Sequence, residues 1–63
     1  MTKILRLPDV MEITGLSRSS IYAYIGQNAF PRPLRLGLRG VGWLESEVID
    51  WINQKIDLRG DNK

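Results

Sequence analysis

The segment Thr14–Ile25 has the pattern of a turn followed by a helix. Gly15 stands where a chain leaving one helix must bend, because glycine adopts turn conformations without steric cost. Ser17 can cap the next helix by accepting hydrogen bonds from backbone N–H groups that lack helical partners. Ile21 and Ile25 lie four apart and therefore share one apolar face. The segment predicts the turn and second helix of a helix-turn-helix, with an ordinary amphipathic helix and a solvated polar face as the alternative.

The length and the missing residue types limit what this chain can do. It has 63 residues and contains neither cysteine nor histidine. Such a chain buries about 60% of its unfolded surface, so it supports one small core but no enclosed substrate pocket, disulfide, thiolate nucleophile or usual zinc site. We expect one domain over residues 1–63, ordered at about 6–57, with no enzymatic activity, no small-molecule substrate and no cofactor or metal. No run of about 18 apolar residues and no signal peptide is present, so we expect a cytoplasmic protein with no membrane partner.

Positive charge gathers in the middle of the chain. Residues 13–44 contain four basic residues and no acidic residue, a net charge of +4, whereas residues 45–63 contain five acids and three bases, a net charge of −2. The four basic residues are all arginines, at positions 18, 32, 35 and 39. Guanidinium groups suit phosphate oxygens because their donors form a planar fork. This distribution favours a nucleic-acid partner.

Helical and alternating patterns divide the chain into four elements. We expect helices at about 8–14, 18–27 and 45–57, and a two-stranded hairpin at 34–44. Ser46 offers a cap for the third helix, although the start could lie a residue or two earlier.

The connector between the second helix and the hairpin has its own signals. Asn28 tolerates the left-handed conformation that often ends a helix. Pro31 and Pro33 stiffen the chain, and Phe30 is expected to be a buried anchor. The other residues expected to face inward are Val10, Met11, Ile13, Leu16, Ile21, Tyr24, Ile25, Val48, Ile49, Trp51, Ile52 and Ile56. The hairpin is expected to pack on the helices through Leu34, Leu36, Val41 or Trp43.

The order helix, turn, helix, hairpin, helix is that of a small winged helix-turn-helix, a mainly α fold with a small β-hairpin. In this layout the second helix enters a major groove, while the hairpin, or wing, lies on the backbone or in the adjacent minor groove. The candidate DNA contacts are Ser17, Arg18, Ser19, Tyr22 and Ala23 in the second helix and its cap, and Arg32, Arg35 and Arg39 in the connector and wing.

Each candidate has a structural alternative. Arg18 and Ser19 could merely be solvated, and Arg39 could belong to a solvated turn. Tyr22 could pack its ring against the first helix, and Arg32 could cap the end of the second helix instead of binding phosphate. The acids that begin the third helix complement its dipole, which explains them without catalysis.

Several motifs together resemble the AlpA family of prophage regulatory proteins. They are Arg6–Val10, Thr14–Tyr22, Phe30–Pro33, Gly37–Val48 and Trp51, which span nearly the whole chain. The resemblance implies a MerR-like or excisionase-like winged helix-turn-helix that binds double-stranded DNA. It also implies a role as a transcriptional regulator or excision factor of a mobile element. The chain departs from the family pattern at the end of the second helix and at the tip of the wing.

We therefore expect a sequence-specific DNA-binding regulator of a prophage or other mobile element. A single module this small has a small footprint, so its specificity should need self-association on adjacent sites or a protein partner such as RNA polymerase or an integrase. An excisionase that assists an integrase is the alternative within DNA binding. Outside DNA binding, the alternative is a protein-interaction module that docks through the apolar rim of the third helix, which would require Trp51 and Ile56 to be exposed.

Overall fold

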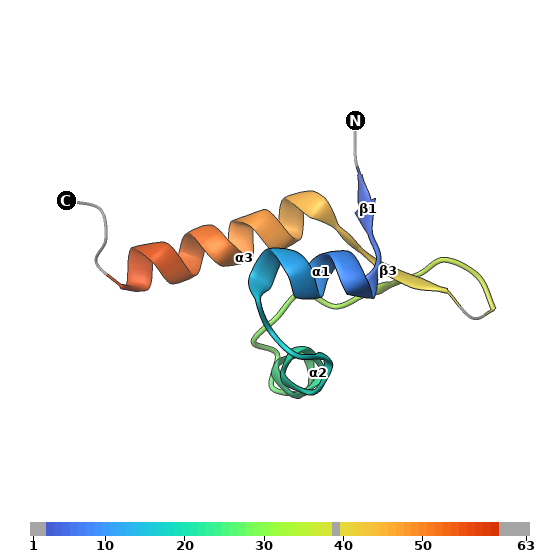
Figure 1. The fold of residues 1–63 in the computed structure, drawn as a ribbon, viewed down its shortest axis with the longest axis horizontal. Coiled ribbons are helices and arrows are strands. Elements are labelled where there is room, and N and C mark those ends of the chain that lie inside the picture. Colours follow the sequence, from blue (N-terminus) through green and yellow to red (C-terminus); the bar gives the residue numbers. More distant parts are fainter. Residues whose placement is uncertain (1–2, 39, 60–63) are drawn as a thin grey trace.

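The structure is a computed structural model of the chain, and it describes residues 3–38 and 40–59. Three helices pack around a small antiparallel sheet, an arrangement compatible with a winged helix-turn-helix (Figure 1). The elements in chain order are β1 (Ile4–Leu5), α1 (Leu7–Thr14), α2 (Arg18–Gly26), β2 (Leu34–Arg35), β3 (Val41–Leu44) and α3 (Glu45–Leu58).

The sheet has three strands in the order β1-β3-β2, with both pairings antiparallel. The antiparallel pairing of β2 and β3 confirms the predicted hairpin, whereas β1 was missed because its two residues form a strand only by pairing with β3. The central strand contains Gly42, where a Cβ atom would lie 2.5 Å from Cγ2 of Ile4 and 2.9 Å from Cδ1 of Leu36. Glycine at this position therefore lets β1 and the side chain of Leu36 close over β3.

The end of α1 and the start of α2 are as predicted from the sequence. Gly15 ends α1 in the left-handed conformation, with φ of 73° and its N–H donating to the Met11 carbonyl at 2.8 Å. The Ser17 hydroxyl begins α2 by accepting a hydrogen bond from the Ser20 N–H at 3.1 Å. Helix α2 ends at Gly26, one residue earlier than expected, and Asn28 follows with a left-handed φ of 58°.

The predicted Ser46 cap of α3 is wrong. Strand β3 runs directly into α3, so Leu44 is the N-cap residue, without a side-chain cap bond, and Ser46 lies inside the helix. The N–H of Glu45 donates instead to the carbonyl of Lys3 at 2.8 Å, which links the start of α3 to the residue before β1.

One core joins the elements. Its buried residues are Leu5, Val10, Ile21, Phe30, Trp43 and Val48.

Four residues expected in the core are instead partly exposed: Ile13 (42%), Tyr24 (37%), Ile49 (40%) and Ile56 (38%). Of the four hairpin residues through which the hairpin could pack on the helices, Trp43 is buried and Val41 is half-buried, whereas Leu34 and Leu36 are exposed. Leu34 and Leu36 lie on or next to β2, an edge strand in a hairpin that extends away from the helices (Figure 1). So small a chain has too few elements to cover both sides of each one.

Two absences hold for residues 3–38 and 40–59. No helix among them is long and apolar enough to cross a membrane. No cluster of three or more acidic, histidine or cysteine side chains among them is placed to hold a metal ion.

Candidate nucleic-acid interface

Two side-chain hydrogen bonds fix the turn between α1 and α2. The Thr14 hydroxyl donates to the Val10 carbonyl at 2.7 Å and accepts from the Leu16 N–H at 3.2 Å. Leu16 is half-buried and packs against the core between the two helices. The angle at which α2 leaves α1 is therefore set by Gly15, Thr14 and Leu16 together.

The outward side of α2 is built from small residues. Ile21 is fully buried, and Ser19, Ala23 and Gly26 lie on the opposite side because they are spaced four and three residues apart. All three are exposed. Small side chains let a helix backbone approach the floor of a groove closely. Arg18 is also exposed and occupies the first helical position, beside this ridge.

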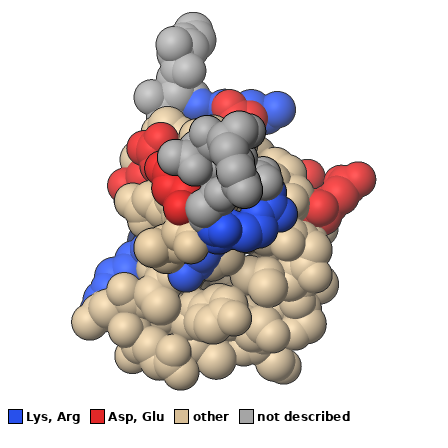
Figure 2. Space-filling model, turned by 90° about the vertical axis from the view of Figure 1, so that its left-hand side faces the viewer, with Lys and Arg blue, Asp and Glu red and all other residues tan. Residues whose placement is uncertain are grey.

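One side of α2 lies in an uncharged part of the surface. Seen from the α3 end of the molecule, the lower part, at the height of α2, shows uncharged side chains, whereas Lys, Arg, Asp and Glu gather above it (Figure 2). No Asp or Glu occurs between residues 13 and 44. A polyanion approaching α2 and the wing therefore meets no carboxylate from this part of the chain.

Tyr22 packs its ring against the sheet, a partner that neither sequence-based alternative named. Its ring lies edge-on to Trp43 of β3, with centroids 6.5 Å apart and an interplanar angle of 64°. The residue is nevertheless 40% exposed. Trp43 thus supports the ring of Tyr22 while leaving much of the side chain at the surface beside the small-residue ridge.

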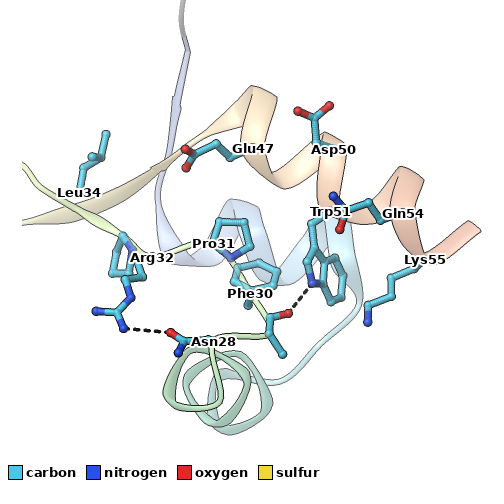
Figure 3. A pocket seen from close by; sticks show the side chains of 12 residues that line it. Asn28, Phe30, Pro31, Arg32, Leu34, Glu47, Asp50, Trp51, Gln54 and Lys55 are labelled. Atoms are coloured by element: carbon cyan, nitrogen blue, oxygen red, sulfur yellow. Dashed lines mark hydrogen bonds between the residues drawn. The ribbon is translucent and has the colours of Figure 1, made fainter. Parts of the chain in front are cut away.

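Two tryptophans hold the connector that follows α2. The indole N–H of Trp43 donates to the Pro31 carbonyl at 2.9 Å. That of Trp51 donates to the Ala29 carbonyl at 2.6 Å (Figure 3). Phe30 lies between these two carbonyls, is 4% exposed, and packs its ring edge-on at 4.8 Å from the ring of Trp51. The expectation that Phe30 is an anchor is confirmed. Together the bonds fix where the chain passes from α2 to the wing.

Arg32 lies at the end of α2. Its Nη2 donates to Oδ1 of Asn28 at 2.9 Å, and both residues are exposed (Figure 3). This contact follows the predicted alternative in which Arg32 closes the end of the helix, although it reaches the side chain of Asn28 rather than a helix carbonyl. A guanidinium has five donors, so one bond to Asn28 orients the group and leaves others for phosphate oxygens.

The wing contains two of the predicted contacts. Arg35 is exposed on β2, opposite Val41 of β3. Arg39 lies outside the described residues. Next to it, the Leu36 N–H donates to the Gly40 carbonyl at 2.8 Å and closes the hairpin loop.

Arg6 is a basic residue that the sequence pattern did not identify. Its Nη2 lies 3.4 Å from the position that a Cβ on Gly40 would occupy, so the side chain rests against the wing. The pairing of β1 with β3 brings Arg6 there, and no local pattern marks that pairing. Arg6 thereby joins Arg35 on the described part of the wing.

The comparisons with known proteins agree with this architecture. Residues 3–56 match the family described as "Prophage CP4-57 regulatory protein (AlpA)". The chain is 37% identical over 62 residues to the DNA-binding transcriptional activator AlpA of Escherichia coli K12, with 89% of each chain covered. It is 46% identical over 54 residues to the uncharacterized protein ORF88 of Enterobacteria phage P4, an alignment that covers 86% of this chain and 61% of the phage protein. The chain therefore belongs to the AlpA family of prophage regulatory proteins, as its motifs predict.

Proposed function

We propose that this protein is a sequence-specific double-stranded DNA-binding regulator, formed by a single domain and acting in the cytoplasm on prophage or other mobile-element genes. The observation that carries the proposal is the exposed side of α2, where Ser19, Ala23 and Gly26 form a small-residue ridge on a helix fixed at both ends. Helix-turn-helix proteins insert such a helix into the major groove. The name of the Escherichia coli relative supports DNA as the partner.

The N-terminal turn of α2 reads the bases in this proposal. Recognition helices use their first residues for base contacts, and Arg18 and Ser19 occupy these positions. The Arg18 guanidinium suits the two acceptors on the major-groove edge of guanine. Ser17, Tyr22 and Ala23 complete the DNA-binding surface of α2. The Tyr22 hydroxyl donates a hydrogen bond to a phosphate of the DNA backbone.

The wing and connector hold the DNA backbone or the adjacent minor groove. Arg35, Arg39 and Arg32 supply guanidinium groups for this role, and we add Arg6 because its side chain rests against the wing. These contacts set register and affinity rather than sequence preference.

A gel-shift assay against DNA flanking the gene tests the proposal. Wild-type protein should give a shift that unrelated DNA of equal length does not compete away. Arg18→Ala should weaken binding and also relax discrimination at one base position, costing about 1–3 kcal/mol for the preferred base. Lys3→Ala removes the same charge near the start of β1 and is the matched control, with little change expected.

Experiments in cells can distinguish the two candidate biological roles, transcriptional regulator and excisionase. A regulator changes the output of a reporter fused to its target promoter through RNA polymerase, whereas an excisionase raises the yield of excised element in the presence of an integrase. The name of the Escherichia coli relative favours the first outcome. A protein that binds no DNA in the gel shift, yet still captures a protein partner through α3, would instead be a protein-interaction module.

A further inference from the structure

Helix α3 leaves a row of isoleucines uncovered. Its C-terminal half extends beyond α1 and α2 (Figure 1), and Ile49 and Ile56 are 40% and 38% exposed. Ile52 lies between them and is half-buried, and Ile13 at the end of α1 is 42% exposed beside it. We call Ile13, Ile49, Ile52 and Ile56 the isoleucine patch.

The spacing of the patch suits contact with another helix. Ile49, Ile52 and Ile56 are three and four residues apart, which is the repeat of a seam between two packed helices. Ile13, Ile52 and Ile56 line a surface groove between the end of α1 and the C-terminal half of α3. Val48 is the buried residue of the helix and Ile52, four residues later, packs partly against the core, so Ile49 and Ile56 are the residues of α3 in the patch that the core leaves most exposed.

The charges of α3 point to a second copy of the same chain as the occupant. The first half of the helix contains Glu45, Glu47 and Asp50 and no basic residue, a net charge of −3, whereas the later part contains Lys55, Asp57 and the C-cap residue Arg59, a net charge of +1. An antiparallel pairing of two α3 helices therefore sets the acidic start of each against the weakly positive end of the other. It also sets the two helix dipoles antiparallel, which is the favourable arrangement.

The residues at the centre of such a pair are compatible with two-fold symmetry. A two-fold axis places a residue against its own copy, so a charge there would repel itself. In an antiparallel pair in which Ile49 faces Ile56 of the other copy, the axis passes between Ile52 and Asn53, which are both uncharged.

We infer that the isoleucine patch is an isologous self-association surface, through which two copies pair their α3 helices antiparallel. The patch is far smaller than the roughly 1,000 Å² that a stable interface buries, so pairing is weak between free chains. Two copies held on adjacent DNA sites would pair readily because their effective concentration is high. That last step rests on the proposed function, whereas the self-pairing itself does not.

Single-cysteine variants test the geometry directly, because the chain contains no cysteine. Under mild oxidation, Ile52→Cys should form a disulfide-linked dimer, and a mixture of Ile49→Cys with tagged Ile56→Cys should cross-link between the two variants. Ile49→Cys alone and the exposed control Gln54→Cys should stay monomeric. A dimer of Ile49→Cys with itself would indicate parallel helices, and equal cross-linking of Gln54→Cys would indicate random collision. Either result overturns the inference.

Sedimentation equilibrium and DNA binding supply the second test. The average mass of wild-type protein should rise above 7.2 kDa with concentration, whereas Ile56→Asp should weaken dimerisation about tenfold or more, and Gln54→Asp should not. On DNA with two adjacent sites, Ile56→Asp should lose cooperativity while binding a single site normally.

Each outcome bears on one proposal. Cross-linking without any DNA binding would leave the self-pairing intact and refute the proposed function. Normal DNA binding by a protein that stays monomeric and uncooperative refutes the self-pairing. If Ile56→Asp abolishes only transcriptional activation, the patch contacts a different protein and the inference is also overturned.

Discussion

Gly42 shows how one residue controls the wing. A side chain at this position would meet Ile4, Leu36 and the carbonyl of Leu5, which lies 3.1 Å from the position of a Cβ. We expect Gly42→Ala to lower the free energy of unfolding by about 1–3 kcal/mol, as overpacking does. Urea denaturation followed by circular dichroism measures this change. Gly37→Ala is the control, because nothing lies within 4 Å of a Cβ there, and an equal loss from both changes would show that the fit around Gly42 is unimportant.

The two serines at helix starts make a second prediction at the scale of residues. Ser17 caps α2 through the Ser20 N–H, whereas Ser46 lies inside α3 and caps nothing. Ser17→Ala should therefore destabilise the protein by about 1 kcal/mol, and Ser46→Ala should leave stability unchanged or raise it slightly. Thermal unfolding of the two variants side by side compares them. If Ser46→Ala were instead the more destabilising change, Ser46 would be a helix cap after all.

At the scale of elements, local patterns were predicted well and long-range pairings were not. Gly15, Ser17 and Asn28 act within a few residues of themselves, so their chemistry is readable from the sequence. Strand β1 exists only because β3 pairs with it, and the contact of Arg6 with the wing follows from that pairing. The false cap at Ser46 has the same origin, since the backbone bond from Glu45 to Lys3 depends on a residue far away in the chain.

The hydrogen bond from Trp51 to the connector should affect DNA affinity as well as stability, because it fixes the path of the chain from α2 to the wing. Trp51→Phe keeps a ring against Phe30 but leaves the Ala29 carbonyl without its indole donor. We expect a loss of about 1–3 kcal/mol in stability. DNA affinity should also fall at a temperature where the variant is fully folded, because the path from α2 to β2 is no longer fixed. Tyr24→Phe is the control, since its ring near Trp51 is retained. Unchanged affinity in folded Trp51→Phe would show that the bond serves stability alone.

At the scale of the whole molecule, the sequence predicted the fold and family but only part of the surface. The four arginines of residues 13–44 were visible from charge alone, and the exposed side of α2 followed from the position of Ile21. The half-exposed isoleucines of α3 looked like core residues, because periodicity shows which residues share a face but not whether another element covers it. Tyr22 could not be assigned in advance for the same reason, since its partner Trp43 lies on a strand.

The distribution of charge over the whole molecule makes the last prediction. If four to six phosphates are neutralised by α2, the connector and the wing, the logarithm of the DNA association constant should fall with the logarithm of salt concentration at a slope of about −4 to −5. Arg35→Ala and Arg39→Ala should each weaken binding to every sequence and make the slope shallower by about one unit, because each removes a backbone contact. Lys3→Ala, with the same loss of charge, should leave the slope unchanged. Fluorescence anisotropy titrations at several salt concentrations measure all four slopes. If the control flattens the slope as much as the wing variants do, overall charge and not the wing holds the DNA.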